Sequence, residues 1–131
     1  MKIYVTGLGV VSGIGIGVSE NIEALRQRKH GIGKITLFPT ALDVPVSEVK
    51  RSNEELKKLI FLPPQRTVSR TALLGMIAAE EAMKDAGLTP PLRIGFISAT
   101  SVGGMDTSQK DQQPLRIGFI SATSVGGMDL S

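Results

Sequence analysis

A perfect internal repeat limits the folds that are open to this chain. The segment from Pro91 to Asp106 (PLRIGFISATSVGGMD) returns without a substitution from Pro114 to Asp129. Each copy is a β-prone run that ends in a glycine-rich turn, and α/β proteins often place ligands at such turns because glycine lets a backbone approach closely. Two identical strands cannot occupy one position in one sheet. We therefore interpret one copy as native and the other as an added duplication, and the residues leave open which is which.

The repeat divides the chain into three parts. We predict an N-terminal α/β portion at residues 1–106, a polar linker at residues 107–113 and a duplicate of residues 91–106 at residues 114–129. Two copies, with nothing of the same period upstream, do not resemble a solenoid. The total of 131 residues is the length of one ordinary domain.

The first half of the chain predicts a strand, a helix and an irregular excursion. Residues 2–11 are rich in Ile, Val, Tyr and Thr, which is typical of a strand buried on both faces. A helix is expected from Glu20 to about Lys29, with Ser19 as its N-cap. Residues 34–49 contain two prolines and are expected to be irregular, with a short strand at their end.

The second half predicts two helices and a further strand. Ser52 and Glu55 have capping-box spacing, which favours a short helix after them. Residues 66–86 form the most regular helical pattern, and residues 92–99 follow as a strand. Within that helix Glu80 and Lys84 are expected to form an i,i+4 pair, and Gly87 is expected at its C-terminal cap. This order of elements predicts an α/β fold with parallel pairing through a right-handed crossover. The expected apolar stripe of the long helix comprises Ala72, Met76, Ala79, Met83 and Ala86, widened by Leu73 and Ile77.

The residue inventory contains no complete active site. The chain has no cysteine, and His30 is its single histidine. These residues therefore provide no thiol nucleophile, thiolate zinc site or multi-histidine cluster. Ser98 and its neighbours lack the G-x-S-x-G context of a serine nucleophile. We assign no catalytic residue, no metal ligand and no cofactor-binding residue.

Glycines at residues 7–13 (GLGVVSG) invite comparison with a dinucleotide-binding fingerprint. The third glycine falls one position late, and no acidic residue lies about twenty positions further on to bind a ribose hydroxyl. We interpret these residues as tight-turn and packing glycines, and we expect no cofactor.

Charge and hydropathy indicate a cytoplasmic protein. The net charge of +3 is spread along the chain, and no basic run is interleaved with aromatic residues, which argues against nucleic acid as a partner. The glycines of residues 1–18 make a poor signal-peptide core. No apolar segment is long enough to span a bilayer, so no membrane association is expected.

Two stretches together carry a family resemblance. Residues 1–12 (MKIYVTGLGVVS) and residues 93–104 (RIGFISATSVGG) resemble the elongating β-ketoacyl-acyl carrier protein synthases. The likeness continues through residues 20–33 and 66–88. It implies the N-terminal half, incomplete, of a thiolase-like fold with αβαβα layers. It also implies a homodimeric parent that condenses an acyl thioester with malonyl-acyl carrier protein in fatty acid or polyketide biosynthesis.

The resemblance places the chemistry outside this chain. In the family, a cysteine thiolate takes the acyl chain from acyl carrier protein, and two histidines stabilise the enolate formed by decarboxylation. Those residues lie in parts of the family sequence that this chain does not contain, so we expect the chain alone to be inactive. Val102, or equally Val125, matches an apolar residue that lines the acyl pocket in the family. Ordinary core packing explains either valine equally well.

Two further hypotheses stay open beside that of an N-terminal portion of a condensing enzyme. One is a non-catalytic ketosynthase-like module for pairing or chain-length control, or an inactive fragment. The other is a small independent binding domain, which requires this chain to fold alone. A strand buried on both faces needs more cover than these helices supply, which argues against the independent domain.

Overall fold

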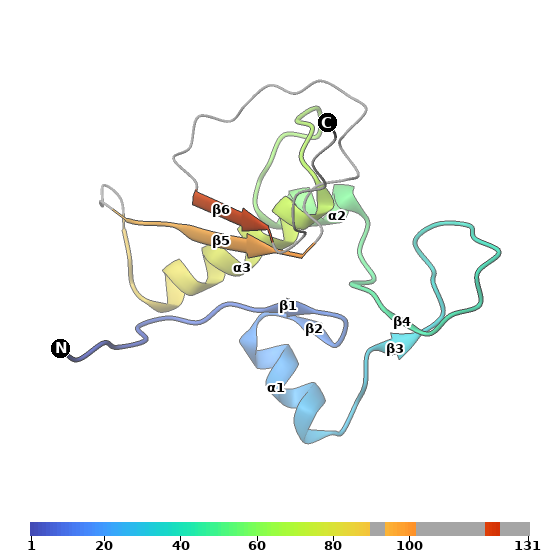
Figure 1. Ribbon diagram of the computed structural model, residues 1–131, viewed down its shortest axis with the longest axis horizontal. Coiled ribbons are helices and arrows are strands. Elements are labelled where there is room, and N and C mark those ends of the chain that lie inside the picture. The colour runs from blue at the N-terminus through green and yellow to red at the C-terminus, as the bar shows by residue number, and fades with distance from the viewer. Residues whose placement is uncertain (90–93, 102–119, 124–131) are drawn as a thin grey trace, which may run out of the picture.

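The computed structural model describes residues 1–89, 94–101 and 120–123 (Figure 1). Within them the chain forms helices and two-stranded sheets. The helices are α1 (Val18–Arg26), α2 (Asn53–Leu59) and α3 (Arg70–Asp85). The strand pairs are β1 (Val11–Ser12) with β2 (Gly15–Ile16), β3 (Ile32–Gly33) with β4 (Val46–Ser47), and β5 (Ile97–Thr100) with β6 (Ile120–Thr123).

The core lies where α2 packs on α3. Leu56 of α2 and Leu73 of α3 are fully buried, and Ile77 one turn further along α3 is nearly so. Apolar side chains of the first strand pair, of the connections around α2 and of α3 itself pack against this cluster: Val11, Ile16, Val49, Ile60, Leu62, Val68 and Leu74. The two helices predicted in the second half of the chain are thus confirmed.

The buried face of α3 is centred differently from the predicted stripe. Leu73 and Ile77, expected at the margin, are the buried residues, whereas Met76 is 41% exposed and Met83 37% exposed. The helix also begins at Arg70 instead of residue 66, because the Ser69 hydroxyl accepts a hydrogen bond from the Ala72 N–H and caps it. Gly87, with φ of +65°, follows the helix end as predicted.

Helix α1 starts without the expected serine cap. Its N-cap is Gly17, with φ of +95° and no capping side chain, and Ser19 lies inside the helix. The first N–H of the helix, on Val18, donates instead to a carboxylate oxygen of Glu81 in α3. The prediction of Ser19 as N-cap is wrong because a residue distant in sequence supplies the acceptor.

The predicted N-terminal strand is also wrong. Residues 1–10 form no regular element, and the side chains of Met1, Ile3, Tyr4 and Val5 are each at least 74% exposed. Among the described residues no strand lies beside this segment to complete a ladder. It runs past α3 instead, as Figure 1 shows, and only Val11 and Ser12 join a sheet.

Most strand pairing differs from the expected parallel crossover. The pairs β1–β2 and β3–β4 are antiparallel, and β4 is the short strand predicted at the end of residues 34–49. The parallel pair is β5–β6, which joins the two copies of the repeat in register. Strand β5 overlaps the end of the predicted strand 92–99, whose first two residues lie outside the described residues, as does linker 107–113. These small sheets do not form a continuous layer, so the layered half-fold stays an expectation.

Candidate functional site

The two valines proposed for an acyl pocket, Val102 and Val125, lie outside the described residues. Their assignment to a pocket therefore stays a prediction. Ser98, which was weighed as a nucleophile, is half-buried in β5, and the single histidine, His30, is exposed after α1. In the described part of the chain, no group of three His, Cys, Asp or Glu side chains is arranged to bind a metal ion.

A groove lies beside α3. It has a volume of about 520 Å³, with apolar walls and a charged side formed by α3. Its lining residues come from the N-terminal segment, from β2 and the start of α1, from the end of α2 and from α3: Leu8, Ile16, Gly17, Val18, Ser19, Leu59, Ile60, Ile77, Glu80, Glu81, Lys84 and Asp85.

Two carboxylates of this groove bind backbone N–H groups of the N-terminal segment and α1. Glu81 accepts from the Val10 N–H at 3.0 Å and, through its other oxygen, from the Val18 N–H at 2.7 Å. Asp85, one turn on, accepts from the Leu8 N–H at 2.9 Å. A carboxylate strengthens such bonds because it carries the acceptor charge. These side chains therefore fasten the N-terminal segment and α1 to α3.

The third carboxylate of the groove is paired within the helix. Glu80 contacts the Lys84 ammonium at 2.6 Å, which confirms the i,i+4 pair expected from the sequence. Each of the three groove carboxylates thus has a structural partner. The groove carboxylates therefore have a structural role in joining segments of the chain. The described residues that line the groove include no cysteine or histidine that could act as a nucleophile or base.

Glycines of the GLGVVSG stretch allow the N-terminal segment to lie directly on α3. A Cβ atom on Gly7 would be 2.2 Å from the Ala82 carbonyl oxygen, and one on Gly9 would be 1.9 Å from that of Ala78. No side chain fits such contacts with a helix backbone. The interpretation of these two residues as packing glycines is confirmed, and the helix's small residues serve the same close approach.

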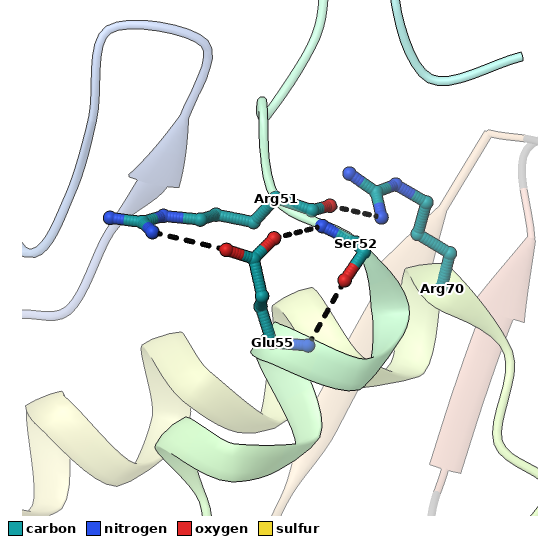
Figure 2. Close-up of polar contacts among 4 residues, drawn as sticks. All are labelled: Arg51, Ser52, Glu55 and Arg70. Carbon is teal, nitrogen blue, oxygen red and sulfur yellow. Dashed lines mark hydrogen bonds and ion pairs between the residues drawn. The ribbon is translucent and has the colours of Figure 1, made fainter.

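A polar cluster at the N-termini of α2 and α3 holds these helices together (Figure 2). The Ser52 hydroxyl accepts from the Glu55 N–H, and the Glu55 carboxylate accepts from the Ser52 N–H at 2.7 Å, which is the predicted capping box. Arg51 adds an ion pair to the same carboxylate at 3.3 Å. Arg70 at the start of α3 donates to the Arg51 carbonyl oxygen at 2.9 Å.

Further bonds from Arg70 extend this cluster. Its guanidinium also donates to the Asn53 side-chain oxygen at 2.9 Å and to the Val49 carbonyl oxygen at 2.6 Å. The backbone N–H of Ser52, followed by the Arg51 side chain, lowers the pKa of Glu55 below its ordinary value of 4.5. This network joins the starts of α2 and α3, whose residues Leu56 and Leu73 meet in the core.

Sequence reasoning missed the groove. Glu81 and Asp85 lie 63 to 77 residues from the backbone N–H groups whose hydrogen bonds they accept, and no local sequence pattern indicates a contact over such a separation. The available signal was weak: Glu81 and Asp85 are acidic residues four apart on a helix otherwise rich in alanine.

Comparison with known proteins identifies what this scaffold resembles. Residues 1–129 match the family described as beta-ketoacyl synthase, N-terminal domain. The 3-oxoacyl-[acyl-carrier-protein] synthase 2 of Coxiella burnetii is 31% identical over 119 residues, covering 84% of this chain and 28% of that protein. The tetracenomycin polyketide synthase ketoacyl synthase beta subunit of Streptomyces glaucescens is 33% identical over 117 residues, covering 85% of this chain and 28% of that protein.

A third relative, the actinorhodin polyketide putative beta-ketoacyl synthase 2 of Streptomyces coelicolor, is 27% identical over 120 residues, covering 85% of this chain and 28% of that protein. The chain thus spans about 28% of the length of each of these curated relatives. No solved structure matches the chain. In the part of the chain that the structure describes, no helix is both long and apolar enough to cross a membrane.

Proposed function

Because this chain belongs to the β-ketoacyl synthase family through its N-terminal domain, we propose that it is the scaffold portion of a β-ketoacyl-acyl carrier protein synthase. The enzyme would condense an acyl thioester with malonyl-acyl carrier protein in fatty acid or polyketide biosynthesis. The observation that carries the proposal is the family match over residues 1–129. The proposal includes acyl carrier protein as partner, a cytoplasmic homodimer and the layered thiolase-like fold.

The described residues support a scaffold role rather than a chemical one. Glu81 and Asp85 fasten the N-terminal segment, and the cluster around Arg70 orients α2 on α3. The sequence holds no cysteine that could form a thioester. Acyl transfer would therefore use a nucleophile from outside these residues, positioned on the frame that α3 supports.

A chimeric enzyme tests the proposal directly. Residues 1–106 of this chain would replace the matching N-terminal portion of the Coxiella burnetii 3-oxoacyl-[acyl-carrier-protein] synthase 2. We expect the chimera to condense an acyl thioester with malonyl-acyl carrier protein, because the nucleophile of the relative would be retained. A chimera with Gly9→Val is the matched control, since a side chain there meets the α3 backbone and should abolish activity. A folded, acylated chimera that fails to condense would contradict the proposal.

The same chimera tests the pocket assignment. We propose that Val102, or Val125 if the second copy is native, lines the acyl pocket. Val102→Phe in the chimera would shorten the preferred acyl chain by filling that space. If the variant reduces stability and leaves chain-length preference unchanged, the valine is a packing residue.

A non-catalytic pairing or chain-length module is the second candidate function. It is favoured by the likeness to the tetracenomycin ketoacyl synthase beta subunit, the relative with the highest identity among those described above. The discriminating measurement is the intact mass of the natural protein together with the coding sequence after Ser131. A downstream segment with a cysteine that becomes acylated supports the enzyme, whereas a downstream segment without one supports the module.

A further inference from the structure

Strand β5 pairs with β6, a strand of identical sequence. Ile97, Ser98, Ala99 and Thr100 lie opposite Ile120, Ser121, Ala122 and Thr123, each residue opposite its identical counterpart. The strands run parallel, and Figure 1 shows them side by side and pointing the same way. The structure therefore contains a self-recognising strand: the segment pairs with a copy of itself, in register.

The composition of the segment suits such pairing. Residues 94–100 (IGFISAT) contain no charge and no proline, and short β-prone segments of this kind stack in register on identical copies. Ile97 in β5 is 84% exposed, and Ile94 before it is 51% exposed. Neither a charged side chain nor a proline within the segment blocks a further strand, and these are the usual protections of a sheet edge.

We propose that an edge of the β5–β6 pair accepts the same segment from a second copy of this chain. Two in-register parallel copies are related by a shift of one strand spacing, roughly 4.8 Å. A third and fourth strand can add by the same shift, and each molecule carries two identical donors. Because this relation is a translation and not a twofold rotation, it does not close. Strand addition therefore produces a series of growing oligomers.

This association is distinct from the homodimer of the proposed function. A twofold dimer has one defined mass and presents the same surface from both partners. Strand addition gives a distribution of masses that shifts upward with concentration. The two proposals can thus fail independently, and the mass distribution separates them.

Charge insertion tests strand addition in the full chain. In Ile97→Lys/Ile120→Lys, every strand added to the stack carries a lysine opposite another, and like charges directly opposite destabilise pairing. Analytical ultracentrifugation should show self-association weakened about fivefold or more. The matched control is Ile3→Lys/Val5→Lys, which adds the same charge at side chains that are 82% and 79% exposed outside the segment.

The control variant should associate like the parent chain, and circular dichroism should show equal helix content in all three proteins. A parent chain that stays monomeric at all concentrations would overturn the proposal. So would a single closed dimer, or equal loss of association in both variants.

Disulfide trapping tests the register, since the chain has no cysteine of its own. Ser98→Cys and Ser121→Cys variants are mixed and mildly oxidised. In-register addition brings these two positions of different molecules to roughly 4.8 Å, within the range of a disulfide. The mixture should yield the mixed covalent dimer. The control mixture pairs Ser98→Cys with Thr123→Cys, two residues out of register, and should not cross-link. Equal cross-linking in both mixtures, or none in either, would contradict in-register addition.

Discussion

Glu81 joins parts of the chain that are far apart in sequence. One oxygen accepts from the Val10 N–H just before β1, and the other accepts from the Val18 N–H at the start of α1. It therefore replaces both a strand neighbour and a helix cap. Gly17 between them has φ of +95°, which strains any other side chain, and a Cβ there would also be 3.0 Å from the same carboxylate.

Replacing this carboxylate should loosen both attachments. Glu81→Gln leaves one acceptor oxygen without charge and puts an amide donor against a backbone N–H. Loss of a charge-assisted bond should lower the hydrogen-exchange protection of the Val10 and Val18 amides about tenfold. Glu80→Gln is the control, because Glu80 pairs with the exposed Lys84, and this variant should leave both amides unchanged. Equal effects of the two variants would contradict the assignment.

Alanine substitution at Gly9 and at Gly75 should change the stability of the local structure in opposite directions. Gly9→Ala places a Cβ atom 1.9 Å from the Ala78 carbonyl oxygen, so the N-terminal segment must separate from α3. Gly75→Ala lies inside α3 with nothing within 4 Å, and alanine favours the helix there by about 1 kcal/mol. Circular dichroism should show more helix for Gly75→Ala. Hydrogen exchange of the Leu8 and Val10 amides should become faster in Gly9→Ala and should not change in Gly75→Ala.

The capping box of α2 makes its stability depend on pH. The Ser52 N–H and then the Arg51 side chain lower the pKa of Glu55 below 4.5. A lowered pKa in the folded state stabilises α2 above pH 4.5, and this contribution is lost as the pH falls through the folded-state pKa. A carbon NMR titration should place the Glu55 midpoint below 4.5 and show α2 fraying with its protonation. Ser52→Pro removes the donating N–H at a φ of −67° that proline can adopt, and combined with Arg51→Ala it should return the midpoint toward 4.5. An unchanged midpoint would refute this cause.

The sequence predicts elements whose determinants are close together in the chain. The α2 capping box was predictable because Ser52 and Glu55 are three residues apart, and Gly87 marked the end of α3 for the same reason. The cap of α1 was not, because its acceptor is Glu81, 63 residues away. The same cause explains the missed groove. The strand at residues 2–11 was mispredicted because a ladder needs a neighbour, and hydropathy alone does not supply one.

The distribution of apolar surface suggests what the described part lacks. Large apolar side chains of the N-terminal segment are exposed beside the groove, and others are exposed along the excursion between α1 and α2. Examples are Ile3, Tyr4, Val5, Leu8, Leu37, Phe38 and Leu42. Burial of a single such side chain is worth about 1.5–3 kcal/mol. A ketoacyl synthase of the length of the curated relatives would provide further chain to cover them, which agrees with the proposed scaffold role.

The 131-residue chain alone should therefore unfold without a cooperative transition. Its buried apolar core in the described residues is Ala24, Leu56, Leu73 and Ile77, and a core of this size cannot offset the entropy of ordering a domain. Calorimetry should show a broad, weak transition, and a dye that binds exposed apolar surface should bind before heating. The chimeric enzyme is the comparison, because its added chain covers the same residues and should restore a sharp transition. A monodisperse sample of the chain with a sharp two-state transition would contradict this prediction and favour a small independent domain.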